Sequence, residues 1–258
     1  MKPNLDISIF QIDLAYKDKR KNYNTIDLLA DKINETDVIL LPEMFNTSFI
    51  PSDITLAEEM SGTTVNWMKS LSKRKNASVA GTLMIKENNL YYNRLVWVSK
   101  NGDIYTYDKC HLFSLAKEER TLTKGNNKII IKENGWSICP LICYDIRFPV
   151  FCRNQDEYDI LIFLSSWPEK RISAWDTLLK ARAIENQCFT IGVNRVGEDL
   201  SGILFPGHSL VYDSFGKILL DCSGQKNTVK KVFLSKEKLQ LQRRQMNFLK
   251  DRDLFTIN

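Results

Sequence analysis

Three side chains that can carry out nucleophilic chemistry occur where apolar, strand-like runs end. Glu43, Lys109 and Cys143 each follow such a run directly, and these runs comprise residues 38–42, 104–108 and 138–142. In α/β sheets, ligands bind at the carboxyl ends of strands, because the loops there can converge on a crevice. A carboxylate, an ammonium and a thiol at three such ends would together form a catalytic site.

The chemistry that fits these groups is attack of a thiolate on a carbonyl carbon. A free cysteine has a pKa of about 8.5, so at neutral pH the Cys143 thiol is mostly protonated and needs a base. Glu43 can accept that proton, and Lys109 can stabilise first the thiolate and then the oxyanion. Cys143 also begins a sharp strand-to-helix turn, where the N–H of Tyr144 can be a second oxyanion donor. Water would then release the acyl group in a second half-reaction.

Taken one at a time, the same residues are compatible with less specific roles. A single cysteine at a strand end is most often a packed small hydrophobic residue, and a Glu or Lys after a strand is usually solvated. A Cys-His arrangement, with His111 or His208 as the base, is a rival for the role of Glu43. We expect His111 to make structural hydrogen bonds in its loop, and His208, after Pro206-Gly207, to be another loop residue.

The composition argues against several other classes of protein. The chain has 258 residues, of which 43% are hydrophobic and 26% charged, and its 36 basic and 31 acidic residues give a formal net charge of +5. The basic residues are scattered without interleaved aromatic residues, so we predict no nucleic-acid binding. No segment approaches the roughly 20 apolar residues of a membrane span, and the first residues lack the apolar core of a signal peptide.

The cysteines do not indicate disulfides or a metal site. Six cysteines occur without the regular spacing of a disulfide framework. Cys139 and Cys143 form a Cys-x3-Cys pair, but a zinc site needs two further soft or imidazole ligands and the chain has only two histidines. We therefore predict no metal, no cofactor, and an intracellular, cytoplasmic protein with reduced thiols.

Strand-like and helical patterns alternate along the chain and would position these side chains. Period-two or short continuous apolar runs predict strands, and apolar residues three and four apart predict helices. The predicted strands comprise residues 5–12, 37–42, 78–85, 91–100, 102–108, 128–132, 136–143, 158–165, 188–196, 209–212 and 217–221. The predicted helices comprise residues 22–33, 63–75, a segment starting near 149, residues 174–186, and 236–249 as a charged helix or extended arm.

This order of elements predicts one α/β domain over residues 1–258, in which helices cover the outer faces of β-sheets. No linker, low-complexity tract or repeat divides it. The turn dipeptides Asn101-Gly102 and Asn134-Gly135 predict antiparallel hairpins, which argue against a purely parallel, doubly wound sheet. We predict that residues 229–258 form a C-terminal tail, to which the sequence assigns no role.

Three segments taken together resemble the signature motifs of the nitrilase (carbon–nitrogen hydrolase) superfamily. They are LPEMF at 41–45, YDKCHLF at 107–113 and LICYDIRFP at 141–149, in the order found in that family. The resemblance implies a four-layer α-β-β-α sandwich of mixed sheets flanked by helices, with Glu43, Lys109 and Cys143 as a catalytic triad. It also implies a homodimer formed through helices after the cysteine motif, such as 149–155 and 175–187.

Members of the family use a second glutamate, in the loop after the lysine motif, to orient the lysine and help position the substrate. In this chain the loop contains Glu118 and Glu119. Counting back from Gly125 by the family's usual spacing favours Glu118 for this role. The alternative is that both side chains are solvated loop charges.

Within the superfamily the chain is most similar to the bacterial ω-amidase branch, which hydrolyses the terminal amide of 2-oxoglutaramate and 2-oxosuccinamate. The segments that carry this similarity are SSWP at 165–168, WDTLLKARAIENQ at 175–187 and NRVG at 194–197. Such an activity would clear products of glutamine-dependent transamination or support methionine salvage. Alternatives are another amidase of the superfamily, a carbamoylase, a nitrilase, or a catalytically silent binding protein, although the intact triad argues against the last.

The implied substrates carry a carboxylate as well as a carboxamide, so a cationic group should lie opposite the nucleophile. Arg147 is the candidate, because a guanidinium can bind a carboxylate in bidentate fashion. The alternative for Arg147 is a structural ion pair with Asp145 or Glu185.

Three aromatic residues beside the motifs are predicted to form the wall of the substrate pocket. They are Phe45, Tyr144 and Trp167. Core packing is the alternative for each of them, and their positions next to motif residues favour the pocket.

Overall fold

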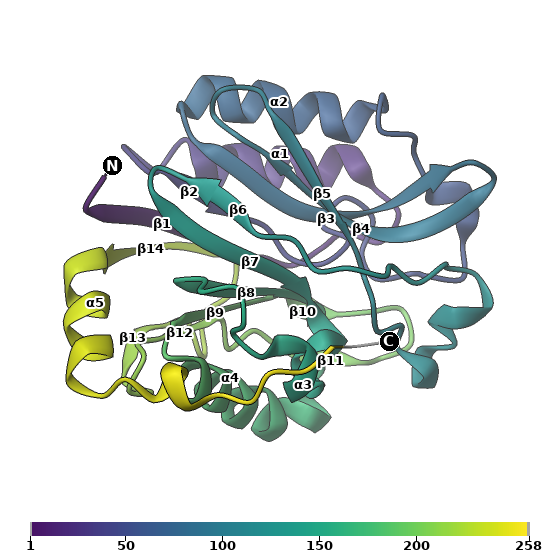
Figure 1. Cartoon of the computed structure of the whole chain (residues 1–258). Coiled ribbons are helices and arrows are strands. Elements are labelled where there is room, and N and C mark those ends of the chain that lie inside the picture. The colour runs from purple at the N-terminus through teal and green to yellow at the C-terminus, as the bar shows by residue number, and fades with distance from the viewer. Residues whose placement is uncertain (1, 257–258) are drawn as a thin grey trace.

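Two six-stranded β-sheets pack face to face in the computed structural model, which describes residues 2–256 (Figure 1). Helices cover the outer face of each sheet, so the layers follow the order α, β, β, α. This arrangement confirms the α-β-β-α sandwich of mixed sheets that the sequence analysis predicts.

The first sheet contains β1 (Asn4–Gln11), β2 (Val38–Leu40), β3 (Ser78–Glu87), β4 (Leu90–Val98), β5 (Ile104–Asp108) and β14 (Thr228–Ser235). The strand order is β14-β1-β2-β3-β4-β5. Strands β1, β2 and β3 are parallel, whereas β4 pairs antiparallel with both β3 and β5. Because the chain reverses twice between β3 and β5, β5 runs in the same direction as β2.

The second sheet contains β6 (Ile131–Glu133), β7 (Trp136–Ile142), β8 (Ile160–Ser165), β9 (Phe189–Asn194), β12 (Leu210–Tyr212) and β13 (Ile218–Asp221). Its order is β13-β12-β9-β8-β7-β6, with β7, β8 and β9 parallel. Every residue of β8 and β9 is buried. Parallel strands covered on both faces lose the polar alternation of exposed strands, which explains the continuous apolar runs in this half of the chain. A separate hairpin joins β10 (Val196–Glu198) and β11 (Leu204–Pro206).

Helices α1 (Lys19–Ala30) and α2 (Thr63–Lys75) cover the first sheet, and α3 (Pro149–Cys152) and α4 (Ile172–Asn186) cover the second (Figure 1). In α2 the buried apolar residues recur at helical spacing, and the helix ends at Asn76 in the left-handed conformation. Its bounds agree with the prediction. The start of α1 lies three residues before the predicted one, because the Asp18 side chain accepts from the N–H of Lys21 and caps the helix there.

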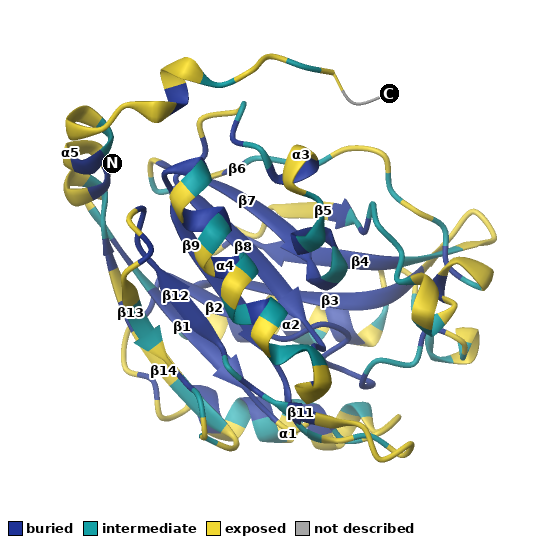
Figure 2. Ribbon diagram, turned by 90° about the horizontal axis from the view of Figure 1, so that it is seen from below, coloured by how far each residue is buried: buried dark blue, intermediate teal, exposed yellow. Residues whose placement is uncertain are grey.

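Two hydrophobic clusters hold the layers together. One fills the space between the sheets and includes Ile7, Trp97, Trp136 and Ile160. The other lies between the first sheet and its helices. Figure 2 shows both sheets as buried along most of their length, with exposed residues on the outer sides of the helices and in the C-terminal segment.

The structure corrects the prediction that a tail begins at residue 229. Strand β14 pairs antiparallel with the whole of β1, from Asn4 opposite Ser235 to Gln11 opposite Thr228. Exposed lysines within β14 weaken its apolar alternation, and its partner lies more than 200 positions away, so the local pattern does not reveal the pairing. Helix α5 (Lys236–Gln245) follows directly, capped by the Ser235 side chain.

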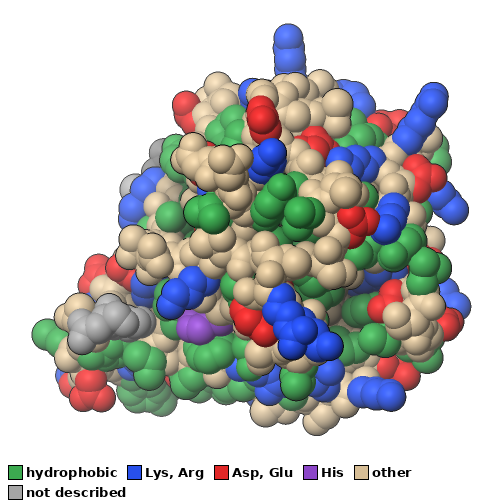
Figure 3. Space-filling model, turned by 90° about the vertical axis from the view of Figure 1, so that its right-hand side faces the viewer, with side chains coloured by type: hydrophobic (Ala, Val, Ile, Leu, Met, Phe, Trp, Pro, Cys, Tyr) green, Lys and Arg blue, Asp and Glu red, His purple; other side chains and the backbone are tan. Residues whose placement is uncertain are grey.

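The surface shows mixed charge. On the face drawn in Figure 3, basic and acidic side chains are interspersed, and no basic stripe runs across it. Among residues 2–256, no helix has the length and apolar character needed to cross a membrane.

Candidate active site

Three strand ends bring the predicted catalytic residues to one edge of the sandwich. Glu43 and Lys109 follow β2 and β5, which run in the same direction within the first sheet. Cys143 directly follows β7 of the second sheet. Because the two sheets pack face to face, residues that are far apart in sequence meet where these strands end.

The Glu43 carboxylate is completely buried, and both of its oxygens accept hydrogen bonds. Oε1 accepts from Nζ of Lys109 at 2.9 Å and from Nδ2 of Asn93 at 2.8 Å. Oε2 accepts from the backbone N–H of Ser166 at 2.9 Å. A buried carboxylate would be costly without such partners, and here they fix its orientation as well.

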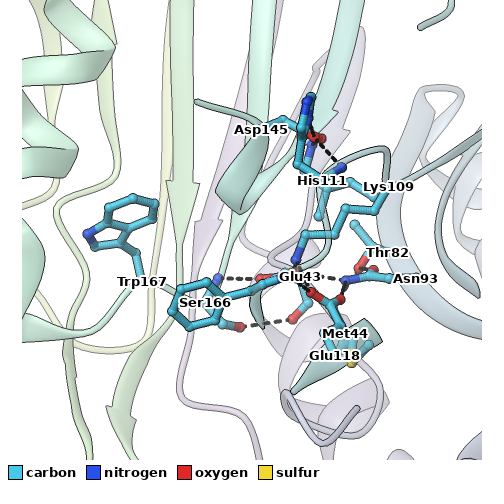
Figure 4. A network of polar contacts seen from close by, with 12 residues as sticks. Glu43, Met44, Thr82, Asn93, Lys109, His111, Glu118, Asp145, Ser166 and Trp167 are labelled. Atoms are coloured by element: carbon cyan, nitrogen blue, oxygen red, sulfur yellow. Dashed lines mark hydrogen bonds and ion pairs between the residues drawn. The ribbon is translucent and has the colours of Figure 1, made fainter. Parts of the chain in front are cut away.

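Lys109 lies between two carboxylates (Figure 4). Its Nζ donates to Glu43 and to Oε2 of Glu118, each at 2.9 Å, and all three side chains are excluded from solvent. Glu118 begins a short 3₁₀ turn, and the same oxygen also accepts from the backbone N–H of Phe113 at 2.7 Å. The structure therefore joins Glu118, and not the exposed Glu119, to the lysine.

Asn93 is part of this network and was not singled out from the sequence. Its Nδ2 donates to Glu43 at 2.8 Å and to Glu118 at 3.0 Å, while its Oδ1 accepts from the Thr82 hydroxyl at 2.9 Å. One amide thus holds both carboxylates towards Lys109. The sequence signal that could have identified Asn93 is a polar amide inside the strand-like segment that forms β4, where the structure buries it.

Cys143 occupies a strained turn between β7 and a 3₁₀ helix that spans Cys143–Arg147. Its φ of 41° lies in the left-handed region, which is uncommon for a residue other than glycine. Such a sharp strand-to-helix turn presents the nucleophile at the end of the sheet and leaves the N–H groups of the first helical turn without intrahelical partners. The side chain is 8% exposed.

The Asp145 carboxylate stabilises this turn through hydrogen bonds. Its Oδ2 accepts from the N–H of Ile142 at 3.0 Å and from the hydroxyl of Tyr107 at 2.8 Å. Its Oδ1 lies 2.7 Å from Nδ1 of His111 and accepts from the N–H of the same residue at 3.1 Å. The carboxylate therefore ties the start of the helix to the loop that follows β5.

Neither histidine lines the cavity beside the nucleophile. Nδ1 of His111 faces Asp145, and its ring stacks on Phe148 with centroids 3.6 Å apart. His208 lies with Nδ1 3.1 Å from Asp176. His111 thus makes the structural contacts that we expected, His208 lies in the predicted loop, and the geometry favours Glu43 as the base.

Burial and neighbouring charges shift the ionisation of the three central groups. Burial, and then the charge of Glu118, raises the pKa of Glu43, although Lys109 opposes the shift. Burial alone would lower the pKa of Lys109, but the charges of Glu118 and Glu43 outweigh it and keep the ammonium protonated. Burial, and then the charge of Glu43, raises the pKa of Cys143 well above its usual range. The resting nucleophile is therefore a thiol that needs a base.

A cavity of about 350 Å³ lies beside Cys143. Its walls come from the loops after β2, β5 and β8, from the turn after β7, and from the β10–β11 hairpin. Lys109 is at its inner end, with Nζ 5.4 Å from the ring centre of Phe49. The cavity has the size of a small-molecule site, with a buried ion network at one end.

Three of the four predicted substrate-binding residues line this cavity, namely Tyr144, Arg147 and Trp167. The Arg147 guanidinium lies over the Trp167 ring, with Cζ 4.8 Å from the ring centre. Within residues 2–256, Arg147 makes no ion pair with Asp145 or Glu185, which argues against the structural alternative. Glu185 pairs instead with Arg182, at 2.8 Å.

Phe45 is the exception, and the structure corrects its predicted place in the pocket wall. It is completely buried in the cluster between the first sheet and its helices, with its ring centre 5.7 Å from that of Trp67. A Cβ placed on Gly81 of β3 would lie 2.5 Å from the Phe45 ring, which shows how closely this side chain packs on the sheet. The chain turns sharply after Glu43, so Phe45 points into the core.

The donor set at this edge suits acid–base and nucleophilic chemistry. Among residues 2–256, no group of three or more His, Cys, Asp or Glu side chains is arranged to bind a metal ion. The predicted base, cation and nucleophile, which are the groups that acyl transfer needs, are all side chains of the chain itself.

Comparisons with known proteins agree with this geometry. Residues 6–244 match the family model described as carbon-nitrogen hydrolase. The ω-amidase YafV of Yersinia enterocolitica is 36% identical to this chain over 255 residues, which cover 98% of each protein. A 2-oxoglutaramate amidase of Bacillus subtilis is 33% identical, and the match covers 87% of this chain and 88% of that protein. The crystal structure of XC1258 from Xanthomonas campestris, described as a CN-hydrolase superfamily protein with an arsenic adduct in the active site, is 34% identical and superposes with a TM-score of 0.97 over 100% of both chains. The predicted resemblance is confirmed: this chain belongs to the carbon–nitrogen hydrolase family and is an amidase of the nitrilase superfamily.

Proposed function

We propose that the chain is an ω-amidase, which hydrolyses the terminal carboxamide of 2-oxo acid amides such as 2-oxoglutaramate and 2-oxosuccinamate to the dicarboxylate and ammonia. The observation that carries the proposal is that Arg147 lines the same cavity as Cys143 without an ion pair to a protein carboxylate among the described residues. A cation opposite the nucleophile suits an amide whose other end is a carboxylate. The relatives named ω-amidase and 2-oxoglutaramate amidase support the same choice.

The first half-reaction forms a thioester. Glu43 accepts the proton of the Cys143 thiol as Sγ bonds to the amide carbon, and the carbonyl electron pair moves onto oxygen. Lys109 and the N–H of Tyr144 stabilise this oxyanion. When the oxyanion collapses, the carbon–nitrogen bond breaks, Glu43 returns the proton to nitrogen, and ammonia leaves.

The second half-reaction regenerates the enzyme. Water attacks the thioester carbon while Glu43 takes one of its protons, and the tetrahedral intermediate forms at the same oxyanion site. Its collapse expels the Cys143 thiolate, which recovers the proton. Glu118 and Asn93 keep the lysine and the base in position throughout, because they bind both through hydrogen bonds of 2.8–3.0 Å.

Ammonia release from a panel of compounds tests this function. The panel contains 2-oxoglutaramate, 2-oxosuccinamate, glutamine, an N-carbamoyl amino acid and a simple nitrile, each assayed with the wild-type protein and with Cys143→Ala. We expect rapid release from the two oxo-acid amides and none from the variant. A thioester adduct on Cys143 should be detectable by mass spectrometry after rapid acid quenching.

The other outcomes separate the alternatives. Preference for the carbamoyl compound or the nitrile would retain the nucleophile and replace the substrate, making the chain a carbamoylase or a nitrilase. No turnover of any compound by a folded protein would favour a catalytically silent binding protein on the same scaffold. Equal activity of the Cys143→Ala variant would refute the proposed mechanism.

We also propose that the enzyme is a homodimer that works in the cytoplasm, where its activity would clear the amides made by glutamine-dependent transamination. The helices named for the dimer, α3 and α4, expose the apolar side chains of Val150 (56%) and Ile184 (42%). A nucleophilic thiol needs a compartment that keeps it reduced. Light scattering coupled to gel filtration would measure the dimer, and a mass of one chain of 29.9 kDa would contradict it.

A further inference from the structure

A second arginine, Arg171, lines the cavity beside Cys143. It ends a short 3₁₀ turn that spans Glu169–Arg171, directly after the loop that carries Trp167. Its backbone N–H donates to the oxygen of Pro168 at 3.0 Å, and its backbone oxygen accepts from Nε1 of Trp167 at 2.8 Å. These two hydrogen bonds fix the backbone of Arg171 relative to Pro168 and Trp167.

Each of the two guanidinium groups in the cavity lies against an aromatic ring. Cζ of Arg171 is 5.0 Å from the ring centre of Phe113, and Cζ of Arg147 is 4.8 Å from that of Trp167. Stacking uses the flat face of a guanidinium, whereas its N–H donors lie in the plane and point outward from the edge. Trp167 and Phe113 thus hold the two guanidinium groups in place and leave their N–H donors available to hydrogen-bond another group.

That partner is not a protein carboxylate within the described residues. Neither Arg147 nor Arg171 takes part in a salt bridge or a side-chain hydrogen bond there. Asp199 is the acidic residue that lines the cavity, and its Oδ1 accepts from the N–H groups of Ser201 at 2.8 Å and Ile203 at 3.0 Å within its own turn. The third cation, Lys109, is already bound by two carboxylates. Two arginines are therefore left facing the cavity.

Two like charges in one partly buried cavity repel each other unless an anion lies between them. Burial lowers the pKa of Arg171, a thiolate formed at Cys143 would raise it, and the charge of Arg147 lowers it, so the two guanidinium groups disfavour each other's charge in the cavity. The ligand that best satisfies the two guanidinium groups is an anion with several oxygen acceptors.

We propose that Arg171 is a second substrate-binding residue, which together with Arg147 binds the 2-oxo carboxylate end of the substrate while the amide lies at Cys143. This inference rests on the proposed function, because it assigns the other end of the same molecule. A 2-oxo carboxylate offers three oxygens in one plane, enough for two planar guanidinium groups. A 2-amino acid amide such as glutamine carries an ammonium at that carbon, which the two arginines repel. Arg171 is thus a determinant of specificity for 2-oxo over 2-amino acid amides.

The test compares Arg171→Met with Lys170→Met, which removes an exposed positive charge from the adjacent position of the same turn. The kcat/KM for 2-oxoglutaramate should fall about 10- to 100-fold in Arg171→Met, the range expected for loss of a hydrogen-bonded charge. It should stay unchanged in Lys170→Met and be partly restored in Arg171→Lys. The ratio of kcat/KM for 2-oxoglutaramate to kcat/KM for glutamine should decrease in Arg171→Met and stay unchanged in Lys170→Met.

A second readout does not depend on turnover. Iodoacetamide, which is neutral, alkylates Cys143, and 2-oxoglutarate should protect it. The half-protection concentration is taken from rates with and without 2-oxoglutarate within each protein, so a change in the reactivity of the thiol itself cancels. We expect this concentration to rise at least 10-fold in Arg171→Met and to stay at the wild-type value in Lys170→Met. An unchanged half-protection concentration in Arg171→Met would overturn the proposal.

The two proposals fail in different ways. Hydrolysis of 2-oxoglutaramate with no effect of Arg171→Met overturns the role of Arg171 and leaves the ω-amidase function intact. Protection by 2-oxoglutarate that depends on Arg171, without hydrolysis of the oxo-acid amides, supports the anion site and refutes the proposed reaction. Absence of both hydrolysis and protection overturns both proposals.

Discussion

The backbone N–H of Ser166 donates to Oε2 of Glu43 at 2.9 Å, across 123 positions of sequence. Glu43 follows β2 of the first sheet, and Ser166 follows β8 of the second. This hydrogen bond therefore connects the two sheets at the edge where the cavity lies. It also orients the carboxylate that we propose as the base, so the relative position of the sheets determines the direction of the Glu43 side chain.

Loss of the Glu118 charge should impair catalysis more than binding. Glu118→Gln removes one of the two carboxylates that hold Nζ of Lys109, so the ammonium can shift from the oxyanion site. We expect kcat to fall on the order of 100-fold, the scale associated with a displacement of about 1 Å. Glu119→Gln, at the exposed neighbouring position, is the matched control and should have wild-type kinetics. Equal effects of the two substitutions would contradict the role of Glu118.

The pH profile of kcat/KM should have an acid limb above the ordinary range of glutamate. Glu43 acts as a base only when ionised, and burial together with the charge of Glu118 raises its pKa from 4.5. Activity should therefore fall as the pH decreases through a midpoint above that value. The charges of Glu118 and Glu43 raise the pKa of Lys109, so no loss of its proton should limit activity below about pH 10. Initial rates across pH 4 to 10 check this, and a midpoint at or below the ordinary pKa of about 4.3 would contradict it.

Asn93→Asp should disrupt the network through repulsion. The new carboxylate would replace the amide that donates to Glu43 at 2.8 Å and to Glu118 at 3.0 Å. We expect the pKa of Glu43 to rise, the acid limb to move to higher pH, and the free energy of unfolding to fall by about 1–3 kcal/mol. Asn66→Asp, at an exposed position in α2, should leave the pH profile unchanged. An unaltered profile in Asn93→Asp would show that the bridging amide is dispensable.

Asp145→Asn should destabilise the turn at the nucleophile. The buried carboxylate accepts four hydrogen bonds, from Ile142, Tyr107 and twice from His111, and an amide can satisfy only part of them. The free energy of unfolding in urea should fall by about 3 kcal/mol, with a lower kcat.

The control for this change is Asp156→Asn, which removes a carboxylate that pairs with Lys128 at 2.7 Å and is 39% exposed. A surface pair of this kind contributes less than about 1 kcal/mol. Comparable losses in the two variants would refute a special role for Asp145.

Local sequence pattern was sufficient for most of the fold. Period-two and helical spacings predict the strands of both six-stranded sheets other than β14, and helices α1, α2, α4 and α5, because hydrophobic periodicity follows directly from which side of an element faces the core. The hairpin β10–β11 was not recognised, since its strands have only three residues each, too few for a period-two pattern to show. Strand β14 was missed because its partner β1 lies at the other end of the chain.

The candidate catalytic residues could be recognised because each follows an apolar strand within a long family motif. Their places at strand ends and the resemblance of these motifs to the family indicated Glu43, Lys109 and Cys143, and the family's usual spacing before Gly125 favoured Glu118 over its neighbour. The same local reasoning placed Phe45 in the pocket, which is wrong, because its direction depends on a turn of the backbone that its neighbours in sequence do not reveal.

By itself, the sequence indicated the family and its layers through three motifs, and the candidate nucleophile, base and cation through the residue types that follow apolar strands. Only the tertiary structure decided which polar groups surround them. Asn93 reaches both carboxylates because of the register between β3, β4 and β5, and Arg171 reaches the cavity because the loop after β8 folds over its edge. Strand register and the packing of one sheet on the other are contacts between distant parts of the chain, and the pattern within a single segment does not specify its partner.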